Sequence, residues 1–164
     1  MPFTGIMLFE EEPERECWHE AGHAIVGHHL GLTVLAIGYS WVSGENADPN
    51  PSTWMATYDG FDNHALATHA LGGMAAEITK LGDYDMGASN SDGQHFQELG
   101  CSFSRDHYTN EAVRILAERD AALVRVYDRL MKERMNPSYP PFEDTIDHMK
   151  KQVHLTREEF EALM

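Results

Sequence analysis

The pattern of apolar and polar positions predicts a helix followed by two strands in the first third of the chain. Apolar side chains recur every three or four residues up to Leu30, which is the spacing of a buried helix face. These side chains are Cys17, Trp18, Ala21, Ala24 and Ile25. The segment 32–39 alternates and is rich in β-branched residues, so it predicts a strand. A turn-rich segment, 43–51, separates it from a second predicted strand over 53–58, which we expect to be antiparallel to the first.

Residues 61–81 keep helical spacing and predict one long helix, with Asn63 as its candidate cap. Its centre contains two adjacent glycines, Gly72 and Gly73. Glycine destabilises a helix interior, so this pair indicates a close backbone approach to the first helix. Glu77 on the same helix is either a hydrogen-bond partner for a metal-binding histidine or an ordinary solvated glutamate.

The remaining chain also predicts mostly helix. Helices are expected over 91–99, over 109–135 as one long amphipathic element, and over 145–151 as a short one. Thr156 and Glu159 form a capping-box pattern that opens the last helix. The first nine residues are expected to be either a short strand or a partner-binding tail.

These patterns predict a mainly α (α+β) fold, in which a helical bundle carries a small antiparallel sheet beside the first helix. A chain of 164 residues is long enough to bury a real core, and we expect a single domain over 1–164. The sheet would serve either as an edge for an extended peptide or as an ordinary hairpin that covers the core.

The charge, the apolar runs and the cysteine count of the chain indicate which partners and which cellular compartment to expect. The net charge is −15, which speaks against a nucleic-acid groove and against an anionic membrane surface. No apolar run approaches the ~18 residues of a membrane span. Two cysteines make no disulfide framework, so a reducing cytoplasm is the expected compartment.

The strongest chemical pattern is His-Glu-x-x-His on the first predicted helix. His19 and His23 lie four residues apart, so both rings can face one ion from the same side of the helix, about 6 Å apart along it. Glu20 lies beside them, where it can take a proton from the attacking water of a zinc hydrolase. Asp92 lies in the first turn of the predicted helix 91–99, where the helix dipole favours the ionised carboxylate that a metal requires. The alternative is two surface histidines on an amphipathic helix.

Three separated motifs resemble the peptidase domain of the FtsH-type ATP-dependent zinc proteases. They are HEAGHA over 19–24, GGMAAE over 72–77 and GASNSD over 87–92. Their order agrees with that family, and the resemblance covers nearly the whole chain from about Glu14 onward. It implies a mainly helical domain with a small sheet.

The resemblance also implies roles for particular residues. His19 and His23 would be ligands of Zn²⁺, Glu20 would be the general base, and Asp92 would be the third ligand. This chain carries one extra residue, Ser91, before that aspartate, which leaves other third ligands open. In order of preference, the alternates are Asp85, Asp83, Glu77 and His95.

The sequence lacks the ATPase phosphate loop, Gly-x-x-x-x-Gly-Lys-Ser/Thr, that members of this family carry. The expected function is therefore a zinc endopeptidase for peptides or unfolded protein segments, unless a separate ATPase feeds it. The ring-forming habit of the family implies a homo-oligomer, although much of that habit belongs to the motor. The alternatives are a zinc-bound, non-cleaving peptide-binding or adaptor module and a metal-free helical scaffold.

Overall fold

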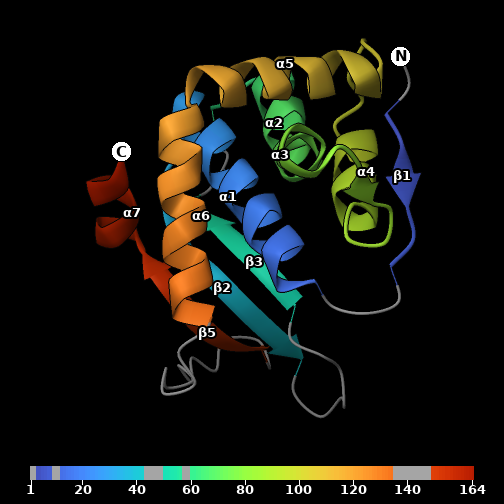
Figure 1. The fold of residues 1–164 in the computed structure, drawn as a ribbon. Helices are drawn as coiled ribbons and strands as arrows, with labels where there is room; N and C mark the ends of the chain where they lie inside the picture. The colour runs from blue at the N-terminus through green and yellow to red at the C-terminus, as the bar shows by residue number, and fades with distance from the viewer. Residues whose placement is uncertain (1–2, 9–11, 43–49, 57–59, 135–148) are drawn as a thin grey trace.

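Helix α1 (Pro13–His29) runs through the centre of the fold and carries both motif histidines (Figure 1). Pro13 begins the helix, where its missing N–H costs no hydrogen bond. Gly31 follows the helix with a φ of 90°, which glycine adopts without strain. The predicted helix and its end are confirmed. The structure, a computed structural model, describes residues 3–8, 12–42, 50–56, 60–134 and 149–164.

A three-stranded antiparallel sheet lies against α1 (Figure 1). Its strands, in the order β3-β2-β5, are β2 (Val34–Val42), β3 (Asn50–Met55) and β5 (Met149–Thr156). The predicted pairing of the first two strands is confirmed. Residues 57 and 58 of the second predicted strand lie outside the described residues.

Strand β5 corrects one prediction. A short helix was expected over 145–151, but the described part of it, 149–151, is the start of β5. Residues 145–148 lie outside the described residues. This segment is a strand because its backbone pairs with β2. In the register of the two strands, Ile37 is opposite Leu155 and Val42 is opposite Met149. Strand β2 is more than 100 residues away in the sequence, so local strand propensity could not predict this pairing.

The predicted single helix over 61–81 is wrong, because the chain breaks at Leu71. The two parts are α2 (Asn63–Ala70) and α3 (Gly72–Leu81). The cap is Asp62 instead of Asn63, since the Asp62 carboxylate accepts a hydrogen bond from the Ala65 N–H at 2.8 Å. Helix α3, the part after the break, packs against α1.

The long helix expected over 109–135 is also two helices. It begins earlier, after the Ser104 cap, and it is interrupted at Arg119. The predicted capping box of the last helix is confirmed, since Thr156 and Glu159 satisfy each other's backbone N–H groups. The remaining helices are α4 (Asn90–Glu98), α5 (Arg105–Glu118), α6 (Asp120–Arg134) and α7 (Arg157–Leu163).

Residues near the start of the chain form a short strand, one of the two predicted alternatives. Strand β1 (Gly5–Ile6) pairs in parallel with β4 (Tyr84–Asp85), in the loop before α4. The Tyr84 N–H donates to the Thr4 carbonyl at 3.3 Å, and the Met86 N–H donates to the Ile6 carbonyl at 2.8 Å. The loop that precedes Asp92 is therefore held by backbone hydrogen bonds to a distant segment.

The main core joins elements from both halves of the chain. Helices α1 and α6 cover the same face of the sheet (Figure 1). Ile25 of α1, Leu123 of α6, Leu155 of β5 and Phe160 of α7 belong to one buried cluster. Cys17 is buried in the same cluster, as predicted for a small apolar side chain. Of the helices described, none is both long and apolar enough to cross a membrane.

Helices α1 and α3 approach each other through glycines, as the glycine pair predicted. A Cβ on Gly22 would lie 2.3 Å from the Gly72 carbonyl oxygen, and one on Gly73 would lie 2.5 Å from His19 Nε2. Neither distance leaves room for a methyl group. Glycine at these positions lets α3 lie close enough to α1 to reach the motif histidines.

We expect Gly22→Ala to lower the free energy of unfolding by about 1–3 kcal/mol, the usual cost of overpacking a dense interface. The matched control is Gly93→Ala in α4, where the added methyl would lie 3.8 Å from the nearest atom of Arg105. It should be neutral or stabilising, because alanine is the better helix former. Urea unfolding of both variants measures the difference, and equal stabilities would contradict the close-packing explanation.

Candidate metal centre

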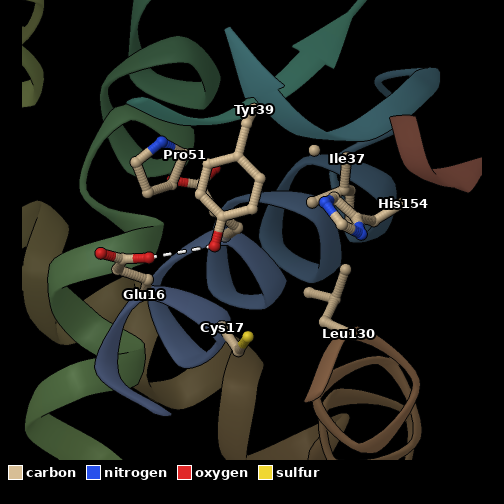
Figure 2. A pocket seen from close by; sticks show the side chains of 9 residues that line it. Glu16, Cys17, Ile37, Tyr39, Pro51, Leu130 and His154 are labelled. Atoms are coloured by element: carbon tan, nitrogen blue, oxygen red, sulfur yellow. Dashed lines mark hydrogen bonds between the residues drawn. The ribbon is translucent and has the colours of Figure 1, made fainter. Parts of the chain in front are cut away.

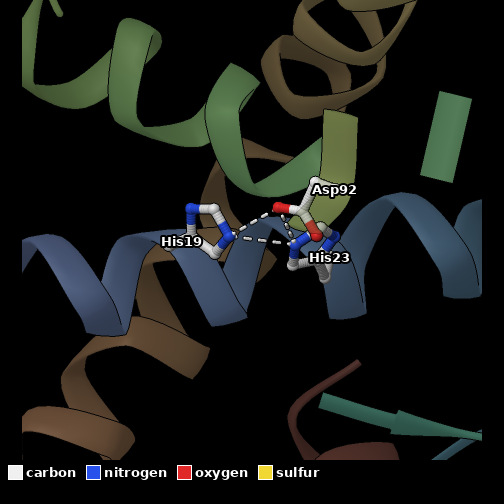
Figure 3. Close-up of side chains that lie close together, drawn as sticks. All are labelled: His19, His23 and Asp92. Atoms are coloured by element: carbon white, nitrogen blue, oxygen red, sulfur yellow. Dashed lines mark hydrogen bonds and ion pairs between the residues drawn. The ribbon is translucent and has the colours of Figure 1, made fainter. Parts of the chain in front are cut away.

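Three ligand-type atoms converge between α1 and α4 (Figure 3). His19 Nε2 lies 2.9 Å from Asp92 Oδ2, and His23 Nε2 lies 3.1 Å from the same oxygen. The two Nε2 atoms are 3.1 Å apart. The structure therefore brings the two motif histidines and the predicted third ligand together, from segments about 70 residues apart in the sequence.

The size and chemistry of this triad suit a small cation. In tetrahedral zinc sites, ligand bonds of ~2.0–2.1 Å place neighbouring donor atoms ~3.3 Å apart, only slightly farther than in this triangle. Two imidazole nitrogens and one carboxylate oxygen are a common donor set for catalytic zinc, and they leave a fourth position for water or substrate. The donor set thus fits Zn²⁺.

The electrostatics of the triad also favour positive charge. Burial disfavours the charged imidazole of His19, but hydrogen bonds to Asp92 and Glu77 outweigh it and raise its pKa well above the usual value. Burial likewise opposes the charge on His23, and the Asp92 carboxylate overcomes it and raises that pKa. The Asp92 pKa is lowered far below its usual range, because the charges and hydrogen bonds of both imidazoles outweigh its burial. The carboxylate thus stays ionised, as metal binding requires.

The ring of His19 is oriented by Glu77. His19 Nδ1 lies 2.6 Å from Glu77 Oε1, and Glu77 is fully buried, so the solvated alternative is wrong. The other carboxylate oxygen accepts hydrogen bonds from Arg15 at 2.9 Å and from the Asp85 N–H at 2.7 Å. A carboxylate on Nδ1 fixes the imidazole tautomer that leaves Nε2 free for a metal.

The ring of His23 is oriented from α2 by a reciprocal pair of contacts. His23 Nδ1 lies 3.0 Å from the His69 carbonyl oxygen, and His69 Nδ1 lies 3.2 Å from the His23 carbonyl oxygen. A carbonyl accepts only, so His23 carries its proton on Nδ1 and presents Nε2 to the triad. Burial lowers the pKa of His69 to about 3, which keeps this ring neutral.

Glu20 lies on the sheet side of α1 and is almost fully buried. Its Oε2 atom accepts a hydrogen bond of 2.6 Å from the Thr53 hydroxyl of β3. Beside it is a small hollow, lined also by Glu16 and Tyr39, which are joined by a hydrogen bond (Figure 2). Its volume of ≈ 20 Å³ is enough for about one water molecule but not for a large side chain.

The alternate third ligands have other positions. Glu77 faces Nδ1 of His19, on the far side of that ring from the triad. Asp83 forms an ion pair with Arg15 at 2.7 Å, and Asp85 Oδ1 accepts from the Gly87 N–H at 3.0 Å. His95 lies one turn after Asp92 in α4 and does not belong to the clustered triad of the described chain.

Several residues around the site were not predicted from the sequence. His69 was not singled out as a site residue, and it is buried in a structural position against His23. Arg15 was not singled out, and it holds Glu77 and Asp83 together. Thr53 was noted only as part of a strand. None of them has a motif partner, so only the fold brings them to the site.

We expect Glu77→Gln to weaken zinc binding about 10–100-fold, the usual cost of losing a carboxylate behind a ligating histidine. The substitution keeps the shape of the side chain and removes the charge that holds His19. Competition with a chromogenic chelator measures the affinity. Glu118→Gln, at an exposed position on α5, is the control and should bind zinc like the wild type. Equal affinities of the two variants would show that Glu77 does not support the site.

Comparison with protein-family models finds no family that matches the chain, and no curated protein matches its sequence. The function proposed below therefore rests on the residues and their geometry.

Proposed function

We propose that the chain is a zinc-dependent endopeptidase related to the FtsH-type peptidase domain. The observation that carries this proposal is the convergence of His19, His23 and Asp92, with Glu20 next to them on the same helix. A helical His-Glu-x-x-His pair alone can arise by chance. A carboxylate that reaches both Nε2 atoms from another helix is a much more specific arrangement.

The residues have separate tasks in peptide hydrolysis. A zinc ion held by the triad would polarise the scissile carbonyl and make a water molecule more acidic. Glu20 takes a proton from this water as its oxygen adds to the carbonyl carbon, and then gives the proton to the amine as the C–N bond breaks. Glu77 and the His69 carbonyl keep the two imidazoles turned so that their Nε2 atoms stay in the triad.

Strand β3 is a suitable seat for an extended substrate. In the described sheet it pairs with β2 on one side only, so its other edge has no strand partner there. An extended peptide can add to such an edge by backbone hydrogen bonds. Because Thr53 of β3 contacts Glu20, a peptide bound along this strand would lie next to the catalytic group.

The proposed substrates are peptides and unfolded segments, which can adopt the extended form that an edge strand requires. Folded proteins would need an ATPase to unfold them. The small number of cysteines is in keeping with a reducing, cytoplasmic setting.

The test is cleavage of casein, an unfolded substrate, by zinc-loaded protein before and after treatment with a strong chelator. We expect cleavage that the chelator abolishes and that added zinc restores. Bound zinc with tight peptide binding but no cleavage would instead favour the adaptor alternative. Protein that retains no zinc after purification in zinc-containing buffer would refute both.

A further inference from the structure

The Glu20 carboxylate is held by a single side-chain hydroxyl. Thr53 Oγ1 lies 2.6 Å from Glu20 Oε2 and 3.1 Å from the Glu20 carbonyl oxygen. A hydroxyl has one proton, and the shorter contact to the charged oxygen is the stronger one. Within the described chain, no other side chain forms a hydrogen bond with this carboxylate.

The position of Thr53 on its strand explains why it reaches α1. Side chains alternate between the two faces of a strand. Met55, two residues on, approaches Gly27 of α1, so Thr53 and Met55 both face this helix. Ser52, the residue before Thr53, points to the opposite face by this alternation, and its hydroxyl lies 3.1 Å from that of Ser40 of β2. Thr53 thus lies on the face of β3 that covers the catalytic helix.

We infer that Thr53 is a positioning residue for the general base. It fixes Oε2 of Glu20, which leaves Oε1 as the oxygen that accepts the proton from water. The terminal torsion of a glutamate is broad, so a carboxylate without such a contact samples many orientations. This inference rests on the proposed peptidase function and assigns a role to a residue of the substrate-side strand.

The arrangement also links substrate binding to the base. Thr53 belongs to β3, whose edge away from β2 is the proposed seat of the peptide. A peptide that adds to this edge orders the same strand that holds Glu20. The catalytic carboxylate is therefore fixed by the element that aligns the scissile bond, and alignment of both groups lowers the entropic part of the barrier.

The kinetic test compares Thr53→Val, which keeps the shape and removes the hydroxyl, with Thr53→Ser, which keeps the hydroxyl. We expect Thr53→Val to lower kcat about tenfold or more at unchanged KM and zinc content, as for loss of a hydrogen bond to a charged group. Thr53→Ser should stay within about twofold of the wild type by the same reasoning. Thr79→Val, which removes an exposed hydroxyl of α3 that donates to the Ala75 carbonyl, is the control for the same chemical change away from β3. Equal losses in the valine and serine variants would overturn the inference.

A second readout does not depend on cleavage. The side-chain carboxyl carbon of Glu20, identified by its loss in Glu20→Gln, is followed by NMR in chelator-treated protein at one pH. It should shift in Thr53→Val and keep its position in Thr53→Ser. An unchanged resonance in Thr53→Val would overturn the inference. Should wild-type protein bind zinc but cleave nothing while this resonance shifts as expected, the peptidase proposal fails and the positioning of Glu20 by Thr53 stands.

Discussion

Glu20→Gln is expected to abolish peptide cleavage while leaving one zinc bound per chain. Glutamine has nearly the same size, so the packing between α1 and β3 is retained. Its amide cannot accept and return the proton that peptide hydrolysis requires, which costs at least about 10²–10⁴-fold in rate. The three atoms of the triad belong to other residues, so zinc binding should not change. Zinc content by elemental analysis and casein cleavage on the same sample measure both effects.

The control for this variant is Glu16→Gln, one turn earlier on the same helix. Glu16 accepts a hydrogen bond from Tyr39 at 3.1 Å and takes no part in the triad. It should cleave like the wild type. If Glu20→Gln retained the wild-type rate, Glu20 would not be the general base, and the mechanism proposed above would be wrong.

Asp92→Ala is expected to remove zinc and activity together. This residue is the only carboxylate that contacts both Nε2 atoms in the described structure. Without Asp92, only two neutral imidazoles remain as ligands. Loss of a contact that merely supports a ligand costs up to about a hundredfold in metal affinity, so loss of the ligand itself should lower the zinc affinity by more than that. Asp92 lies in the first turn of α4, a helix without a buried residue, so the fold should persist, as circular dichroism can verify.

Asp85→Ala is the matched control, because Asp85 was the first alternate for the third ligand. Its carboxylate caps the Gly87 N–H, and only its backbone N–H reaches Glu77. The variant should keep zinc. Retention of zinc in Asp92→Ala together with its loss in Asp85→Ala would reverse the ligand assignment.

The parts of the fold that follow local rules were predictable from the sequence. Pro13 and Gly31 bracket α1, and the Thr156–Glu159 capping box begins α7, because caps and turns depend on residues a few positions apart. The paired glycines 72 and 73 also predicted, from neighbouring positions alone, that two helices approach each other closely. Glycine in a helix interior is costly unless a neighbour needs the space.

The parts that depend on distant partners were not predictable. Strand β5 forms because β2 offers an edge, and the helix breaks at Leu71 and Arg119 follow from tertiary packing that overrides an uninterrupted helical pattern. Predicted helices over 61–81 and 109–135 were too long for this reason. Periodicity shows which face is buried, but it does not show where a helix must change direction.

The candidate site divides in the same way. His19, Glu20 and His23 lie within five residues, so helix geometry alone brings them together. Asp92 came from the family resemblance, and its place in the triad depends on the approach of α4 to α1. The supporting contacts of His69 and Thr53 involve segments 30 to 50 residues away, and no pattern in the sequence connects them to the motif.

The most direct test of the account is a zinc titration of chelator-treated protein with casein cleavage as the readout. If the triad holds one catalytic zinc, activity rises in proportion to added zinc and reaches a plateau at one equivalent per chain. Binding of one equivalent without cleavage, or a plateau at any other stoichiometry, would contradict the account of a single catalytic zinc held by His19, His23 and Asp92.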